Sequence, residues 1–308
     1  MVALLLEHKV GLLSLALLLS WLLPITTLQA AISTGITKLG LRLNNSDYSP
    51  LYLQAAGGGL LICLYVPLAA AYWALAVLAP WPSLLEPLLL WLFLDLGRLR
   101  QAVPACLTHA QQQTPLARLS LAPLCLRHTE ALSPLGVYKA VAETSTLRLA
   151  ADFALLFWYL AGGIYSALAF GLLRLAVQAW PVKLAPWRLF GQLASISYRA
   201  LAWLPVHLLA FTLLIYPGSK RALKAWPQGK LWAYPAAGRL LAVAGAGIDS
   251  GLGGPRRYTQ TTEYYPKLGT SQLLTLESCR RLLVRLTVAL LFWLSLAWLL
   301  LLVPYFYG

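Results

Sequence analysis

The sequence predicts an all-α fold: a polytopic integral membrane helical bundle with about five spanning helices and one or two short interfacial or re-entrant helices. Hydrophobic residues make up 59% of the 308 residues and charged residues only 11%, against roughly 25% charged in a usual globular domain. Apolar runs of about 20 residues recur, which is the length that a helix needs to cross a bilayer. Lys and Arg outnumber Asp and Glu by 24 to 10, and they gather between these runs. The observations exclude a soluble domain.

The spanning helices are predicted where the chain stays apolar, because every backbone amide in the hydrocarbon must bond within its own helix. The fourth run is shorter than the others, and Arg174 near the end of the third is expected to extend to the lipid headgroups. The first run has the alternative of a cleaved signal peptide, but its length and the runs that follow favour an uncleaved anchor. In chain order the runs are Val10–Gln29, Gly58–Ala79, Phe153–Val177, Ala200–Tyr216 and Leu286–Phe306.

Two further apolar stretches are too short to be predicted as spans. Leu84–Leu96 contains Glu86 and Asp95, and Ala236–Ile248 is rich in Ala and Gly. Stretches of about 10–14 residues are more often interfacial, re-entrant or buried in protein than membrane-crossing. Both are therefore expected to lie as helices against the bundle.

Positive charge predicts the orientation, because Lys and Arg are retained on the cytoplasmic side. Residues 97–151 contain six Lys and Arg, and residues 217–285 contain eleven. Two predicted spans separate these segments, so both should face the cytoplasm. The simplest organisation is a single membrane domain over 1–308 with two cytoplasmic inserts, 97–151 and 217–285. The predicted location is the inner (plasma) membrane, with the lipid bilayer as a partner.

A repeated Cys-x-x-His pattern suggests a metal site. Cys106 precedes His109, and Cys125 precedes His128, at the same spacing. Four such ligands are able to close a tetrahedral zinc site. The separation of the two units is not one of the common zinc-finger spacings, however, and a free Cys packs well among apolar neighbours. We therefore predict no metal ligands.

The segment 251–258, Gly-Leu-Gly-Gly-Pro-Arg-Arg-Tyr, is the most distinctive of the sequence. Its glycines and proline predict a fixed, irregular turn whose backbone amides can face an anion, and Arg256 and Arg257 supply donors suited to phosphate. The alternative is a tight turn whose arginines bind lipid headgroups. The first interpretation predicts an anionic small-molecule partner, and no nucleic acid.

These residues belong to a longer pattern. The stretch from Tyr234 to Gly269, together with Arg127-His128-Thr129 and the run Lys139-Ala-Val-Ala-Glu-Thr144, resembles the adenosylcobinamide-phosphate synthase family (CobD/CbiB) of cobalamin biosynthesis. Several polar residues of the family are replaced here: His128 stands for an Asp, Ala236 for an Asn and Leu241 for a Glu. The region Trp203–Leu208 looks more like AmpE, the membrane protein of β-lactamase regulation.

The resemblance implies an ATP-dependent amide ligation of aminopropanol phosphate to adenosylcobyric acid at the cytoplasmic membrane face, with Mg-ATP and a corrin substrate. It also implies that Glu143 is the remaining acidic candidate for catalysis, acting on metal or amine. The lost polar residues leave open a catalytically degenerate, AmpE-like regulatory or ligand-sensing protein, and an oligomer is also left open. The predicted substrate-binding residues are Arg127, Thr129, Gly253, Gly254, Pro255, Arg256, Arg257, Tyr258 and Lys267.

Overall fold

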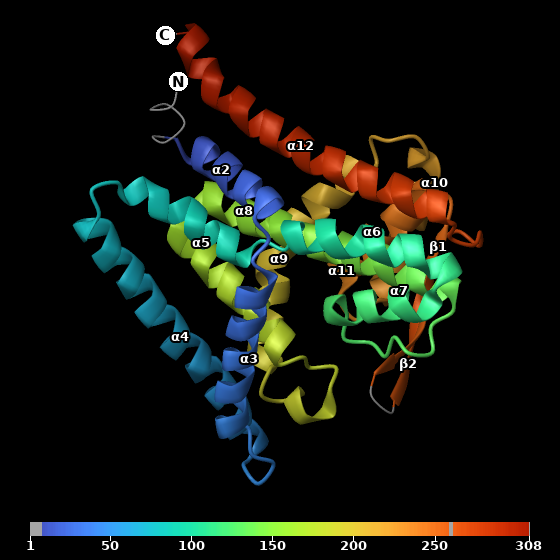
Figure 1. Cartoon of the computed structure of the whole chain (residues 1–308), viewed down its shortest axis with the longest axis horizontal. Helices are drawn as coiled ribbons and strands as arrows, with labels where there is room; N and C mark the ends of the chain where they lie inside the picture. The colour runs from blue at the N-terminus through green and yellow to red at the C-terminus, as the bar shows by residue number, and fades with distance from the viewer. Residues whose placement is uncertain (1–7, 259–260, 308) are drawn as a thin grey trace. The chain divides into compact units, whose positions relative to one another are not determined.

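The structure is a computed structural model that describes residues 8–258 and 261–307, without the side chains of residues 261 and 303–307. The chain divides into two compact units, each built from two stretches of sequence (Figure 1). Unit 1 comprises Met1–Gly97 and Ala154–Ala202, and unit 2 comprises Arg98–Phe153 and Trp203–Gly308. Both predicted inserts fall almost entirely in unit 2.

The regular structure of unit 1 is helical over its described residues. Within it, α2 packs against α5 and α3 against α4. Its elements are α2 (Lys9–Leu22), α3 (Thr26–Leu43), α4 (Pro50–Leu78), the 3₁₀ turn η1 (Pro82–Leu84), α5 (Leu85–Phe93), the later part of α8 (Pro134–Ala179), η3 (Ala185–Trp187) and the start of α9 (Gln192–Leu213).

The first predicted span is not straight. The chain bends by 100° between α2 and α3, so the prediction of one helix over Val10–Gln29 is wrong. Pro24 lies in the break, and proline lacks the backbone N–H that would continue the ladder. The bent pair counts as one broken span or as a re-entrant loop.

The expectation for Arg174 is also wrong. Its side chain is only 3% exposed, and its Nη2 lies 2.8 Å from Oδ2 of Asp95, which is itself buried. Arg174 also donates to the carbonyl of Phe93 at 3.1 Å. Apolar side chains and a nearby carboxylate thus hold this guanidinium inside unit 1 instead of at a headgroup. Hydropathy alone gave no sign that Asp95, at the end of α5, lies beside it.

The third predicted span is longer than expected. Helix α8 covers Pro134–Ala179 and so includes residues that were predicted to belong to a cytoplasmic insert. It is interrupted at Gly163, which has φ 75° and ψ −167°. That backbone conformation favours glycine, because a Cβ would clash there.

Unit 2 contains α6 (Leu96–Gln112), α7 (Thr114–Leu121), the start of α8 and the end of α9, with smaller elements after them. Helices α10 and α11 pack against each other, and both contact the two-stranded sheet (Figure 1). The remaining elements are η2 (Ala122–Leu124), α10 (Ser219–Ala225), η4 (Trp226–Leu231), α11 (Pro235–Gly247), β1 (Gly251–Tyr258), β2 (Thr261–Gly269) and α12 (Leu276–Tyr307).

The two short apolar stretches form short helices, as expected. Leu84–Leu96 contains α5, and Ala236–Ile248 forms most of α11. Eleven of the 13 residues of α11 are buried. Small Ala and Gly side chains make this possible, since they let neighbouring backbone approach closely. Helix α11 therefore lies at the centre of unit 2.

Four described helices are long and apolar enough to cross a membrane: α4, α8, α9 and α12. A fifth is added if α2 and α3 form one broken span. Apart from one two-stranded sheet, the regular structure of the described chain is helical. The prediction of an all-α, polytopic membrane fold is confirmed, and the small sheet is an addition that the sequence pattern did not predict. The single membrane domain remains a prediction.

Candidate functional site

The Gly-Gly-Pro segment is a bulged β-strand, which corrects the prediction of a turn. β1 pairs with β2 as an antiparallel hairpin, and the register shifts between Gly253 and Pro255. Gly253 has φ 78° and Gly254 φ 95°, a left-handed conformation that glycine adopts without the strain of a Cβ. Bulges of this kind redirect the side chains that follow them. Beyond the bulge Arg256 is buried and Arg257 exposed.

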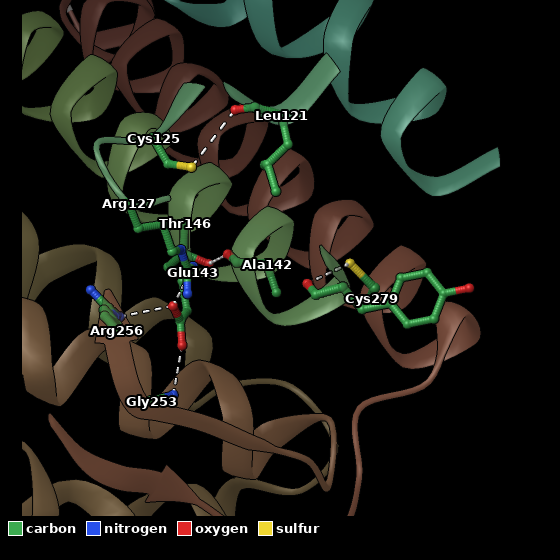
Figure 2. Close-up of polar contacts among 10 residues, drawn as sticks. Leu121, Cys125, Arg127, Ala142, Glu143, Thr146, Gly253, Arg256 and Cys279 are labelled. Carbon is green, nitrogen blue, oxygen red and sulfur yellow. Dashed lines mark hydrogen bonds and ion pairs between the residues drawn. The ribbon is translucent and has the colours of Figure 1, made fainter. Parts of the chain in front are cut away.

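Glu143 lies at the centre of a buried polar cluster (Figure 2). It projects from α8, and its side chain is 2% exposed. One carboxylate oxygen, Oε1, accepts the backbone N–H of Gly253 at 2.6 Å. The other, Oε2, accepts Nη2 of Arg127 at 2.7 Å and Nη2 of Arg256 at 2.8 Å. We call these four residues the Glu143 cluster.

Aromatic rings enclose the Arg256 side chain. Its guanidinium carbon lies 4.8 Å from the ring centre of Trp232 and 4.7 Å from that of Tyr265, so two π faces contact one cation. Burial by itself lowers the pKa of Arg256, but the negative charge of Glu143 and the contact with Tyr258 outweigh it, and the net shift is upward. Arg256 is therefore a fixed, permanently charged part of the cluster.

The cluster joins the two basic segments of the sequence. Arg127 and Glu143 come from residues 97–151, whereas Gly253 and Arg256 come from 217–285. A backbone hydrogen bond adds to this connection, because His128 N–H donates to the carbonyl of Arg257 at 2.9 Å. Removing one partner from a buried ion pair costs about 3–5 kcal/mol, since the other charge is left unpaired. The two segments are thus held together by charge as well as by packing.

The predicted site residues separate into three groups. The first forms the Glu143 cluster, and the second is buried. The third is exposed on the hairpin and includes the basic residues Arg257 and Lys267. The first group is Arg127, Gly253 and Arg256, together with Glu143. The second is Thr129, Gly254 and Tyr258. The third is Pro255, Arg257 and Lys267.

Several contributors to the site were missed from the sequence. Trp232 and Tyr265 form the aromatic enclosure, and Gln228 fixes the far end of the hairpin. The Gln228 side-chain amide accepts the N–H of Gly269 at 2.8 Å and donates to the carbonyl of Gly269 at 3.2 Å. An isolated Gln or Trp in a loop carries no periodic signal, so only the three-dimensional arrangement identifies these residues.

Among the residues that the structure describes, no group of three or more His, Cys, Asp or Glu side chains is arranged to hold a metal. Burial raises the pKa of Cys106 to about 11, which keeps its sulfur protonated, whereas a metal ligand must be a thiolate. The oxygens of Glu143 already accept three hydrogen bonds.

Comparison with known proteins gives a consistent result. The profile of a family described as CobD/Cbib protein matches residues 3–301. A protein of Stutzerimonas stutzeri named cobalamin biosynthesis protein CobD is 32% identical over 212 residues, covering 67% of this chain and 70% of the relative. A protein of the same name from Chromobacterium violaceum is 30% identical over 235 residues and 74% of each chain. No solved structure matches.

Proposed function

The chain belongs to the CobD/CbiB family, and from this membership we propose that it is an amide-forming ligase of cobalamin biosynthesis, an adenosylcobinamide-phosphate synthase. The amine of aminopropanol phosphate would attack a carboxyl group of adenosylcobyric acid that ATP has activated as an acyl phosphate. The new amide bond replaces the bond to phosphate, the amine loses a proton, and ADP and phosphate are released. Both relatives bear cobalamin biosynthesis names, which does not favour the regulatory alternative.

One structural observation supports this proposal more than any other. The segments that carry the family's motifs are distant in sequence, yet they meet at the Glu143 carboxylate through Arg127, Gly253 and Arg256. An enzyme needs such preorganisation, because a reacting group must be held within a fraction of an ångström. The polar framework of the region is therefore intact even though several family residues are replaced.

Within this framework we assign Glu143 a positioning role. Three donors already contact its two oxygens, so it orients the bulge and both arginines instead of taking a proton from the amine. Arg257 and Lys267 are exposed on the hairpin, and we propose that they attract the phosphate or carboxylate groups of the substrates. The earlier expectation that Glu143 acts in catalysis, on metal or amine, stays an untested prediction.

Magnesium would enter with the nucleotide. Mg²⁺ is commonly bound by one or two carboxylates together with substrate phosphates, and it keeps several waters. The described residues offer no cluster that would hold it without ATP. We therefore assign no step to a protein-held metal, and propose only that ATP brings its own Mg²⁺.

The proposed location is the inner membrane. Helices α4, α8, α9 and α12 have the length and composition of spans, and the positive-inside rule favours a cytoplasmic position for residues 97–151 and 217–285. Both segments lie in unit 2 and contact each other there, which supports a common side. ATP and the phosphorylated amine are water-soluble, so a cytoplasmic site gives them direct access.

The reaction is tested with the protein purified in detergent. Adenosylcobyric acid, aminopropanol phosphate and Mg-ATP are added, and the amide product is followed by mass spectrometry. We expect product, a strong loss of kcat/KM in Arg257→Gln, and little change in Arg188→Gln, which alters an exposed arginine of unit 1. Absence of product under conditions in which another family member turns over would overturn the proposal.

A further inference from the structure

Unit 2 contains a second basic site, away from the Glu143 cluster. A cleft of about 530 Å³ lies where the end of α11, the start of α10 and the first turns of α12 meet. Its lining includes Arg221, Arg281 and Arg285 but only one acidic residue, Asp249. The volume is in the range of small-molecule sites, about 300–1,000 Å³.

Helix α12 places several polar side chains toward this cleft. Ser278, Arg281 and Arg285 are spaced three and four residues apart, which puts them on one face of the helix. Arg285 Nη1 donates to the carbonyl of Gly247 at 2.8 Å, at the end of α11. Arg281 Nη2 donates to the Ser278 hydroxyl at 3.2 Å. A carbonyl thus holds Arg285 at the cleft wall, whereas Arg281 contacts a hydroxyl and, at 4.0 Å, the exposed carboxylate of Glu277.

The positive charge of the cleft is only partly balanced. Arg221 lies 3.5 Å from Asp249, with both side chains about half exposed, so water screens this pair. Arg285 experiences repulsion from both Arg281 and Arg221. Like charges four residues apart also destabilise a helix. The arrangement therefore opposes folding slightly, and an anion in the cleft would relieve it.

We propose that this cleft binds the phosphate group of a small molecule, either a phosphate monoester or a diphosphate. The cleft lining holds three arginines and one aspartate, and among the described residues the only ion pairing of Arg281 is a 4.0 Å contact with the well-exposed Glu277. This excess of positive charge suits a phosphate monoester, which carries about −1.5 to −2 near neutral pH. Guanidinium groups also match the oxygens of phosphate in geometry, and Ser278 adds a hydroxyl. The inference depends on neither the ligase reaction nor the Glu143 cluster.

Gly218 keeps the cleft open. Its φ is 98°, and a Cβ at this position would lie 2.6 Å from the carbonyl oxygen of Gly247 and 3.4 Å from Arg221 Nη2. An added methyl group would therefore push α10 away from α11 and displace Arg221. We expect Gly218→Ala to weaken anion binding together with stability, so it is a poorer test than changes to exposed arginines.

The test uses the full chain in a neutral detergent and inorganic pyrophosphate as the probe, with binding measured by calorimetry. We expect saturable binding, and at least a tenfold increase in Kd for the double variant Arg221→Gln/Arg281→Gln. The matched control is Arg280→Gln, which alters an exposed arginine of α12 outside the cleft lining and should change Kd less than twofold. Thermal unfolding without ligand verifies that each variant is folded.

A second arm identifies the source of the phosphate. Short-chain phosphatidylglycerol replaces pyrophosphate with the same variants. Binding of this lipid that requires Arg221 and Arg281, without binding of pyrophosphate, would assign the cleft to a phosphodiester headgroup and overturn the proposal of a monoester or diphosphate ligand. Binding of neither probe would overturn the proposal, as would binding that Arg280→Gln weakens as much as the double variant does. If pyrophosphate binds but no ligase product forms, the proposed ligase function fails and the proposed phosphate site stands.

Discussion

Replacing Glu143 by Gln tests the cluster at its centre. Gln has nearly the same shape and keeps an oxygen for the N–H of Gly253, so the variant removes mainly the negative charge. Arg127 and Arg256 then remain 10% and 7% exposed without a carboxylate. The cost of leaving a buried charge unpaired is about 3–5 kcal/mol. Because Arg256 also has the rings of Trp232 and Tyr265, we expect the lower half of that range.

The assay is denaturant unfolding of the purified protein in detergent, followed by tryptophan fluorescence and circular dichroism. Glu130→Gln is the matched control, because it alters an exposed glutamate of the same segment and should change the free energy of unfolding by less than about 0.5 kcal/mol. A loss in Glu143→Gln no larger than in this control would refute the reasoning. Such a result would mean that the arginines find other partners, or that water enters the cluster.

Three more predictions follow from single contacts. Gly253→Ala should destabilise the hairpin more than Gly254→Ala. Both residues have positive φ, which costs an alanine about 1–2 kcal/mol. Only at Gly253 would the Cβ also clash, because it would lie 2.3 Å from the carbonyl oxygen of Pro266. Equal losses in unfolding free energy would contradict this. Arg174→Gln should cost about 3–5 kcal/mol because it removes the cation of a buried ion pair with Asp95. Arg188→Gln should be nearly neutral in the same unfolding assay. Cys106 has a pKa of about 11 and a buried side chain. In a variant that keeps it as the only cysteine, it should resist maleimide at pH 8 and react once the protein is denatured. Fast labelling of the folded protein would contradict this, because it would show that the site is open to solvent.

The helical fold was predictable from the sequence because a spanning helix requires a long run of apolar residues, which is visible in the sequence. Apolar length identified α4, α9 and α12, and it also identified α5 and α11 as too short to cross. Hydropathy did not reveal the bend at Pro24, because apolar residues lie on both sides of it. It also did not reveal the extension of α8 into the polar segment that contains Glu143.

The candidate site was predictable only in part. Motif resemblance identified Glu143, Arg127, Gly253 and Arg256, and the structure brings these four together. The sequence did not show that Arg256 is directed inward, because one bulged residue reverses which side chains of a strand face the core. The arginines of the second cleft come from separate elements, and no local pattern connects them.

The most direct test of the account is the sidedness of the two basic segments. Single cysteines are introduced at the exposed positions Glu130 and Lys267 in a chain whose four native cysteines are replaced, and a membrane-impermeant maleimide is applied to right-side-out and inside-out vesicles. We expect both positions to label only in inside-out vesicles, because the Glu143 cluster holds their segments together and the positive-inside rule favours the cytoplasmic side for both. Labelling of the two positions from opposite faces would contradict it.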